Sequence, residues 1–283
     1  MPVPPPLPDL ILDPIVRLAL TEDLGRAGDL TTDATIAPGT EMRATINARK
    51  PGILAGMDAA AYALKLVDPS VSLEVAIHDA GKLSPGAAIA TLSGPARSIL
   101  IAERTMLNFL GRLSGIATLT GAFVEKVAGS NATIVCTRKT TPGHRAVEKR
   151  AVRCGGGTSH RYGLDDAISI KDNHIAACGS ISEALKRAHA YAGHLRMIEI
   201  EVDTLAQLEE ALPHKPHAVL LDNMDNETLR KAVAMIDGAC KAEASGGVNL
   251  DTVAGIAETG VDYISVGALT HSASNLDVGL DVA

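Results

Sequence analysis

Residues 135–175, VCTRKTTPGHRAVEKRAVRCGGGTSHRYGLDDAISIKDNHI, are the stretch from which the rest of the chain is interpreted. Between Arg138 and Arg161 this stretch contains seven basic residues and one acid, Glu148, although the formal net charge of the chain is −7. Basic side chains at this density repel one another unless an anion lies among them, and arginine matches the geometry of carboxylate and phosphate groups. We therefore predict a binding site for a small polyanion. The seven basic residues are Arg138, Lys139, Arg145, Lys149, Arg150, Arg153 and Arg161.

Length and composition predict a large domain with a smaller one beside it. The chain has 283 residues, 46% of them hydrophobic, but only 2% are aromatic and none is Trp. The core is therefore expected to consist of Ala, Leu, Ile and Val. The acidic net charge argues against general nucleic-acid binding, which requires a basic face.

The cysteines and the N-terminus indicate a cytoplasmic protein. The four cysteines are widely spaced and form no CxxC pair, which is typical of reduced thiols in the cytosol. The first residues, MPVPPPLPDL, lack a basic segment and an apolar run, so we expect an extended, poorly ordered lead-in and no secretory signal. No stretch approaches the roughly 18 apolar residues that span a membrane, so no membrane association is expected.

The first part of the chain predicts a mixed α+β domain of about 110 residues. A helix is expected over 13–24, starting at Asp13 and Pro14, and Gly25 is expected to end it. A further helix is expected over 57–67, and a long helical stretch over 97–127 forms the crossing between domains. Gly111 and the pair Ser114–Gly115 are expected to break that stretch into two helices. Strands are expected over 42–48, 71–77 and 87–92.

From residue 133 onward, short apolar runs alternate with helical patterns. This alternation predicts βα units with parallel strands, arranged as a barrel or a doubly wound sheet. The runs lie at 133–137, 167–170, 197–202, 218–221, 240–245 and 263–267.

Polar residues follow these predicted strands at their carboxyl ends. In βα barrels the carboxyl ends of the strands meet at the active site, so these residues are expected to surround one cavity. The alternatives are structural: solvated basic side chains, a Lys171–Asp172 ion pair, a paired Glu201, a helix cap at Asp222, a loop histidine at His160 and plain glycine turns. The candidates are Arg138, Lys139, His160, Arg161, Lys171, Glu201, Asp222, Ser245, Gly246, Gly247 and Gly267.

The histidines show no zinc-type spacing. If a metal takes part, we expect Mg²⁺ held mainly by substrate phosphates, with Glu201 or Asp222 assisting directly or through water.

Three motifs in fixed order carry a resemblance to a known family. They are TRKTTPG at 137–143, GGG-x-x-HR at 155–161 and IKDNH at 170–174. Together they closely resemble the signature of the quinolinate phosphoribosyltransferases, the carboxylating nicotinate-nucleotide pyrophosphorylases. The resemblance implies an N-terminal α+β sandwich domain over 1–112, an incomplete seven-stranded α/β barrel over 113–270, and a C-terminal tail, 271–283, that packs back on the first domain.

The resemblance also implies a reaction. Quinolinate would attack phosphoribosyl pyrophosphate through its ring nitrogen, with Mg²⁺ as cofactor, giving pyrophosphate, CO₂ and nicotinate mononucleotide in NAD biosynthesis. Lys139, Lys171, Glu201 and Asp222 are the implied catalytic residues, Lys139 facing the leaving pyrophosphate and the two carboxylates the ribose. The implied substrate-binding residues are these four with Arg104, Arg138, His160, Arg161, Ser245, Gly246, Gly247, Gly267, Ala268 and His271.

A matching E-R-x-x-x-N pattern at Glu103, Arg104 and Asn108 implies a homodimer in which Arg104 enters the neighbouring subunit's site. The chain departs from the family pattern at Ser159, where Asn is expected, at Arg150, where an aromatic residue is expected, and at His144, where an apolar one is expected.

Three other interpretations stay open at this point. One is a related enzyme with a different pyridine or anionic acceptor. Another is an aldolase-like barrel in which Lys171 forms a Schiff base. The third is a phosphate-binding sensor without catalysis.

Overall fold

A computed structural model of the chain describes residues 3–282 and divides into two compact units. Unit 1 comprises Met1–Gly121, Thr140–Gly156 and Leu269–Ala283, and unit 2 comprises Ala122–Lys139 and Gly157–Ala268. The segments therefore interleave: the boundary expected near residue 112 lies inside one long helix, and residues 140–156 belong to unit 1.

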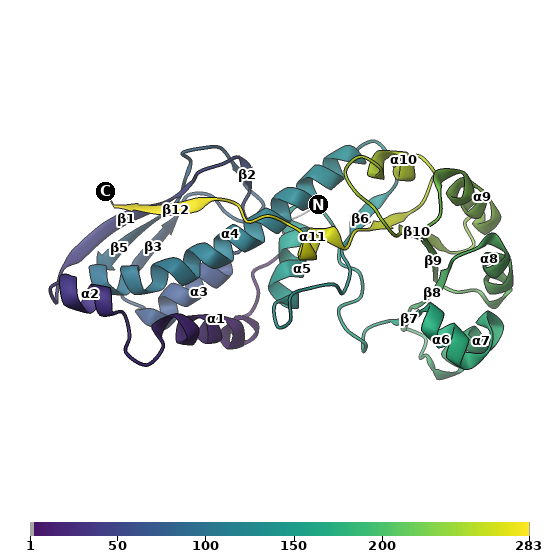
Figure 1. Cartoon of the computed structure of the whole chain (residues 1–283), viewed down its shortest axis with the longest axis horizontal. Helices are drawn as coiled ribbons and strands as arrows, with labels where there is room; N and C mark the ends of the chain where they lie inside the picture. The colour runs from purple at the N-terminus through teal and green to yellow at the C-terminus, as the bar shows by residue number, and fades with distance from the viewer. Residues whose placement is uncertain (1–2, 283) are drawn as a thin grey trace. The chain divides into compact units, whose positions relative to one another are not determined.

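Unit 1 is built on a four-stranded antiparallel sheet with helices along one face (Figure 1). Alternate residues of the central strand, Ala44, Ile46 and Ala48, are fully buried, as the period of two in a half-buried strand requires. The last strand pairs with the first, with Leu280 opposite Ile46. The sheet order is β12-β1-β5-β3. The elements of this unit are α1 (Asp9–Leu24), α2 (Leu30–Thr35), β1 (Glu41–Ala48), β2 (Gly52–Ile53), α3 (Met57–Val67), β3 (Ser72–Val75), β4 (Lys82–Leu83), β5 (Ala88–Pro95), most of α4 (Ala96–Lys126), α5 (Arg145–Cys154), most of α11 (Ala268–His271) and β12 (Val278–Val282).

The N-terminal segment is more ordered than its composition predicts. Helix α1 begins at Asp9, one turn before the expected start, and contains Pro14 in its interior. The added turn buries Leu12 against the core, and this burial outweighs the hydrogen bond that the proline removes. The expectation of a poorly ordered lead-in is wrong for the described residues, since Pro4 is buried and the carbonyl of Pro5 accepts a hydrogen bond of 2.9 Å from Arg150.

Helix α4 continues through Gly111 and Gly115, so the expected break is wrong. The glycines serve a close contact instead: a Cβ at Gly115 would lie 2.0 Å from the carbonyl oxygen of Ser274. The Leu276 N–H also donates to the Gly111 carbonyl, at 2.9 Å. Because these glycines have no side chain, the backbone of the C-terminal segment can pack directly against the backbone of α4. By length and composition α4 could cross a membrane, but 61% of its most apolar window is buried, as in the core helix of a globular domain.

Unit 2 contains six parallel strands, and each lies within or overlaps a run expected from the sequence. The order is β6-β11-β10-β9-β8-β7. Ser180, Thr204 and Asp225 cap the helices that follow three of the strands. The elements are β6 (Thr133–Val135), β7 (Ile168–Ile170), α6 (Asp172–Cys178), α7 (Ile181–Tyr191), β8 (Ile198–Val202), α8 (Leu205–Ala211), the 3-10 turn η1 (Leu212–His214), β9 (Ala218–Asp222), α9 (Asn226–Ile236), β10 (Lys241–Ser245), α10 (Val253–Ala257) and β11 (Tyr263–Ser265).

A seventh strand position is reduced to one residue. Thr158 forms a parallel bridge with Val135, donates to the Ile134 carbonyl at 2.8 Å and accepts from Cys136 N–H at 3.1 Å. Its place after the glycines 155–157 explains its shortness, because glycine disfavours extended pairing. The six parallel strands, with the bridge at Thr158 beside β6 in the seventh position, agree with the incomplete seven-stranded barrel that the resemblance implied.

Candidate functional site

A cavity of about 530 Å³ opens at the carboxyl ends of the unit 2 strands. Eight of the residues predicted from the sequence line it, although they are spread from position 138 to position 245. Side chains that follow parallel strands converge in this way because the strands end at the same edge of the barrel. Those eight are Arg138, Lys139, His160, Arg161, Lys171, Glu201, Asp222 and Ser245, and the cavity also contains Thr137, Ser169, Leu220, Glu243 and Ser265.

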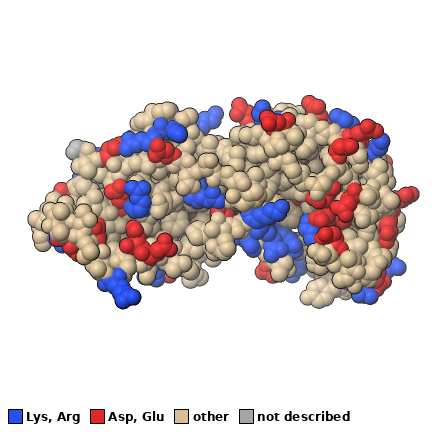
Figure 2. Space-filling view, viewed as in Figure 1, with Lys and Arg blue, Asp and Glu red and all other residues tan. Residues whose placement is uncertain are grey.

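Acidic groups occupy one wall of this cavity. Glu201 lies in β8 and Asp222 ends β9, and Lys171, just after β7, donates a hydrogen bond from Nζ to Glu201 Oε2. The ion pairing suspected between Lys171 and Asp172 is therefore formed with Glu201 instead. Asp222 accepts from the side-chain amide of Asn223 at 2.5 Å, and Asp225 caps α9, so Asp222 is not the cap. Figure 2 shows acidic side chains gathered beside these strands and basic ones across a hollow from them.

Basic groups form the opposing wall. Burial, followed by the nearby Arg138 guanidinium, lowers the pKa of Arg161. Within the described part of the chain, the buried Nε of Arg138 has no hydrogen-bond partner. The guanidinium groups of Arg138 and Arg161 repel each other, and Arg138 Nε is a hydrogen-bond donor without an acceptor. An anion bound between them would relieve the repulsion and accept this hydrogen bond.

The seven basic residues of 138–161 are divided between the two units. Only Arg138, Lys139 and Arg161 line the cavity, whereas the other four lie on α5 in unit 1. Arg150 there forms ion pairs with Asp79 and, at 3.3 Å, with Asp58. Only part of the cluster is therefore available to the predicted polyanion, because carboxylates of the protein neutralise Arg150.

The turn after β10 brings backbone close to the cavity. Gly246 has φ +93°, and a Cβ there would lie 2.1 Å from Asn223 Oδ1, so a side chain is excluded. The carbonyl of Ser245 accepts from Asn223 N–H at 2.9 Å, which ties this turn to the end of β9.

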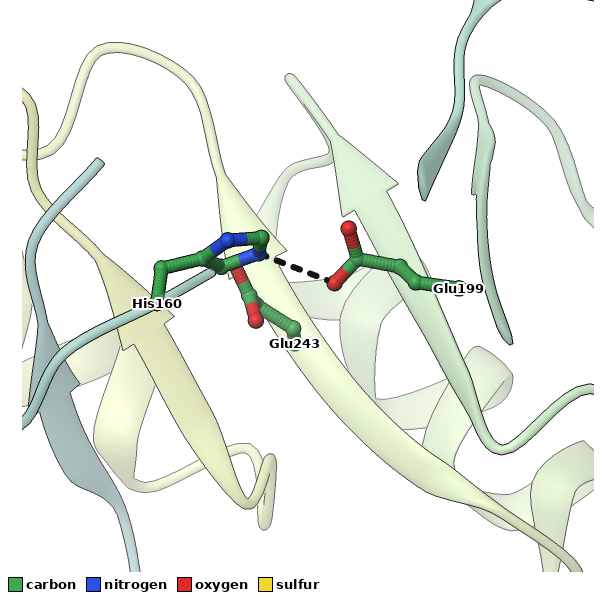
Figure 3. Close-up of side chains that lie close together, drawn as sticks. All are labelled: His160, Glu199 and Glu243. Atoms are coloured by element: carbon green, nitrogen blue, oxygen red, sulfur yellow. Dashed lines mark hydrogen bonds and ion pairs between the residues drawn. The ribbon is translucent and has the colours of Figure 1, made fainter. Parts of the chain in front are cut away.

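A layer of three polar side chains, His160, Glu199 and Glu243, is shown in Figure 3, and His160 and Glu243 also line the cavity. His160 Nε2 lies 3.1 Å from Glu199 Oε1 and 3.6 Å from Glu243 Oε1. Ser169 donates to the other Glu199 oxygen at 2.8 Å. Burial and the Glu199 charge raise the pKa of Glu243 to about 7. Burial acts in the same direction on Glu199, but hydrogen bonds from His160 and Ser169 leave its pKa lowered.

Our sequence reasoning predicted His160 but missed Glu199, Glu243 and Ser169, although a signal was present. Side chains two residues apart in a strand share one face, so Glu199 lies below Glu201, Glu243 below Ser245 and Ser169 below Lys171. An acidic residue that lies in an apolar strand two positions before a candidate site residue, as Glu199 and Glu243 do, is therefore expected to point toward the inside of the barrel.

Several predicted residues do not line the cavity. Gly246, Gly247, Gly267 and Ala268 lie in unit 2 just beyond β10 and β11. Arg104 is exposed on α4, and His271, whose Nδ1 lies 2.7 Å from Ser272 Oγ, belongs to unit 1. Their roles in binding stay predictions.

The three departures have local surroundings of their own. Ser159 Oγ is buried without a hydrogen-bond partner among the described residues. The ring of His144 stacks on Phe109 with centroids 6.3 Å apart. Arg150 fills an internal position where its charge is neutralised by Asp58 and Asp79.

Sequence comparison links almost the whole chain to named relatives. It is 45% identical over 272 residues to the nicotinate-nucleotide pyrophosphorylase [carboxylating] of Mycobacterium leprae, covering 94% of this chain and 95% of that protein. It is 43% identical over 297 residues to quinolinate phosphoribosyltransferase [decarboxylating] 1b of Nicotiana tabacum, covering 99% of this chain and 84% of that protein.

Solved structures agree. The nicotinate-nucleotide pyrophosphorylase from Francisella tularensis superposes with a TM-score of 0.94 at 39% identity, covering 98% of each chain. Human nicotinic acid phosphoribosyltransferase, with a TM-score of 0.63 and 12% identity over 94% of this chain and 74% of that chain, shares the fold. The family descriptions that match are "Quinolinate phosphoribosyl transferase, N-terminal domain" over residues 29–114 and "C-terminal domain" over residues 116–281. The chain belongs to the quinolinate phosphoribosyl transferase family.

Proposed function

We propose that the protein transfers the phosphoribosyl group of phosphoribosyl pyrophosphate to quinolinate and releases pyrophosphate and CO₂, forming nicotinate mononucleotide. The observation that carries this proposal is that cations, among them Arg138 and Arg161, and carboxylates, among them Glu201 and Asp222, line the same cavity. A dicarboxylate acceptor and a ribose that becomes positively charged during transfer need these opposite surroundings.

The basic wall suits quinolinate. Arg161 and Arg138 offer fork-shaped donors for the two carboxylates, and Lys171 adds a point charge. Removing the acid from water strengthens these contacts and orients its ring nitrogen toward the second substrate.

The acidic wall suits the ribose of phosphoribosyl pyrophosphate. Glu201 and Asp222 accept hydrogen bonds from ribose hydroxyls and stabilise positive charge at C1 as the bond to pyrophosphate breaks. Lys139, which lines the cavity, is proposed to attract the departing pyrophosphate. The backbone around Ser245–Gly247 and Gly267–Ala268 is proposed to bind the 5′-phosphate. The ring nitrogen supplies the electron pair for the new bond, so the protein needs no covalent nucleophile.

Mg²⁺ is proposed as the cofactor. Carboxylate oxygens of Glu201, Asp203 and Asp222 lie within 4.8 Å of one another, and such an oxygen set fits this ion. When bound with the substrate, Mg²⁺ would neutralise pyrophosphate charge.

We also propose a cytoplasmic homodimer in which Arg104 serves the partner's site. The motif match at Glu103, Arg104 and Asn108 and the exposure of Arg104 on α4 support this proposal.

The alternative Schiff-base chemistry is less well supported. Lys171 donates a hydrogen bond to Glu201, and an ion-paired ammonium is not a nucleophile. A sensor without catalysis would have no need for paired acidic and basic walls.

The test is incubation of the purified protein with quinolinate, phosphoribosyl pyrophosphate and Mg²⁺. CO₂ and pyrophosphate are expected in equal amounts, with no CO₂ when nicotinate replaces quinolinate. Pyrophosphate release with another pyridine acid but not with quinolinate would identify a related enzyme, and binding without pyrophosphate release would identify a sensor.

A further inference from the structure

The polar layer of His160, Glu199 and Glu243 separates two cavities of unit 2. The first is the candidate site at the carboxyl ends of the strands. The second, of about 440 Å³, lies at the amino ends, where it contacts the first residues of β7, β8, β9, β10 and β11. His160 and Glu243 line both cavities, so the layer is the partition between them.

The hydrogen bonds of His160 fix its tautomer. The backbone N–H of Arg161 donates to His160 Nδ1 at 2.8 Å, so that nitrogen carries a lone pair. The proton of the neutral ring therefore lies on Nε2, which faces Glu199 Oε1 at 3.1 Å. In this arrangement the ring of His160 is neutral, and both of its nitrogens are hydrogen-bonded.

Two carboxyl groups compete for that single N–H. Glu199 receives it together with the Ser169 hydroxyl, whereas Glu243 Oε1 is 3.6 Å away and has no hydrogen-bond partner among the described residues. Both carboxyl groups are buried beside the same nitrogen of His160, and two ionised carboxylates in these positions would repel each other strongly. One of them must hold a proton, and we assign it to Glu243, whose Oε1 has no hydrogen-bond partner among the described residues.

We propose that Glu243 is a positioning residue for the acidic substrate. As a neutral carboxylic acid it leaves the Nε2 proton of His160 to Glu199 and keeps a second negative charge from beneath the bound dicarboxylate. This inference rests on the proposed function, because it takes quinolinate as the anion in the cavity.

The charges around Glu243 determine how it responds to pH. Burial and then the Glu199 charge oppose the ionisation of Glu243, whereas a hydrogen bond with Ser265 and the charge of Lys171 favour it. With a pKa of about 7, Glu243 is neutral below neutral pH and ionises above it. The remaining groups that line the cavity come from each neighbouring element. After β6 these are Thr137, Arg138 and Lys139, and after Thr158 they are His160 and Arg161. Ser169 lies in β7 and Lys171 follows it, Glu201 lies in β8, Leu220 and Asp222 lie in β9, and Ser265 lies in β11.

The test measures the KM of each substrate from pH 6.5 to pH 8.5 for the wild type and for Glu243→Gln. In the wild type the KM for quinolinate is expected to rise about tenfold, since one more charge near the anion acts through a partly buried medium. The side chain of Glu243→Gln is neutral at every pH. In this variant the KM for quinolinate at pH 8.5 is therefore expected to be nearly equal to its KM at pH 6.5. The KM for phosphoribosyl pyrophosphate should keep the same pH dependence in both proteins. The exposed-surface control Glu209→Gln should match the wild type.

A second measurement needs no variant of the layer. Calorimetry at pH 8.5 in two buffers of different ionisation enthalpy should show proton uptake when the wild type binds quinolinate, whose carboxylates are already ionised. No uptake would overturn the proposal, as would an unchanged rise of KM in a folded Glu243→Gln protein. A metal retained through dialysis in the wild type and lost from Glu243→Gln would assign the layer to a metal instead. Absence of any turnover in the wild type would reject the proposed reaction, whereas turnover with the wild-type pH dependence in Glu243→Gln rejects only the role of Glu243.

Discussion

Lys171 donates a hydrogen bond from Nζ to Glu201, which joins the cation expected to bind quinolinate to the carboxylate expected to bind ribose. The two residues lie at the ends of the paired parallel strands β7 and β8. The contact therefore joins the two proposed substrate sides of one cavity.

Replacing a cation that lines the cavity should weaken use of quinolinate. For Lys171→Ala and Arg161→Ala we expect kcat/KM for quinolinate to fall by an amount equivalent to about 2–5 kcal/mol, the usual effect of removing one partner of a desolvated charge pair. Steady-state kinetics should be compared with Lys186→Ala, an exposed lysine on α7. Wild-type kinetics in both variants would remove these residues from the site.

Replacing a carboxylate of the acidic wall should act on the other substrate. Glu201→Ala and Asp222→Ala are expected to lower turnover or binding of phosphoribosyl pyrophosphate, because they remove acceptors for the ribose hydroxyls and stabilisation of positive charge at C1. Calorimetry should show quinolinate affinity largely retained, as in the exposed control Glu209→Ala. Loss of quinolinate affinity with normal phosphoribosyl pyrophosphate binding would place the carboxylates on the acid side.

Subunit mixing tests the shared site. Inactive Arg104→Ala chains are mixed with inactive Arg138→Ala chains and allowed to exchange. If Arg104 acts in the partner's site, each mixed dimer contains one intact site, and with random pairing roughly a quarter of all sites should recover. If it acts within its own chain, every site lacks one residue.

The readout is specific activity after exchange has been verified by mass. Mixing either variant with itself is the control and should give no recovery. Verified exchange without recovery would contradict the shared site.

Arg150 should stabilise unit 1 without taking part in chemistry. Its guanidinium forms buried ion pairs with Asp58 and Asp79, so Arg150→Ala leaves two carboxylates unneutralised. We expect the free energy of unfolding in urea to fall by about 3–5 kcal/mol. Arg153→Ala, on the exposed side of the same helix α5, is the matched control and should change it by less than about 0.5 kcal/mol. Equal stability of the two variants would show that the buried pairs contribute little.

The sequence by itself determined the parallel strands and eight of the residues that line the candidate cavity. All six parallel strands could be placed from apolar runs, and eight lining residues from their position just after those strands, because strand ends of a barrel converge whatever their separation in the chain. The prediction that Gly111 and Gly115 break the long helix was wrong. The sequence does not distinguish a glycine that breaks a helix from one that lets another segment of backbone pack closely against it.

Only the tertiary structure decided which charges are available to a ligand. The basic residues of 138–161 are neighbours in sequence, yet Arg150 is neutralised by Asp58 and Asp79, about 90 and 70 positions earlier, while Arg138 and Arg161 line the cavity. Likewise, Glu199 and Glu243 meet at His160 only because β8, β9 and β10 are paired side by side. Charge and protonation depend on distances between residues remote in sequence, and these distances are set by the packing of the whole unit.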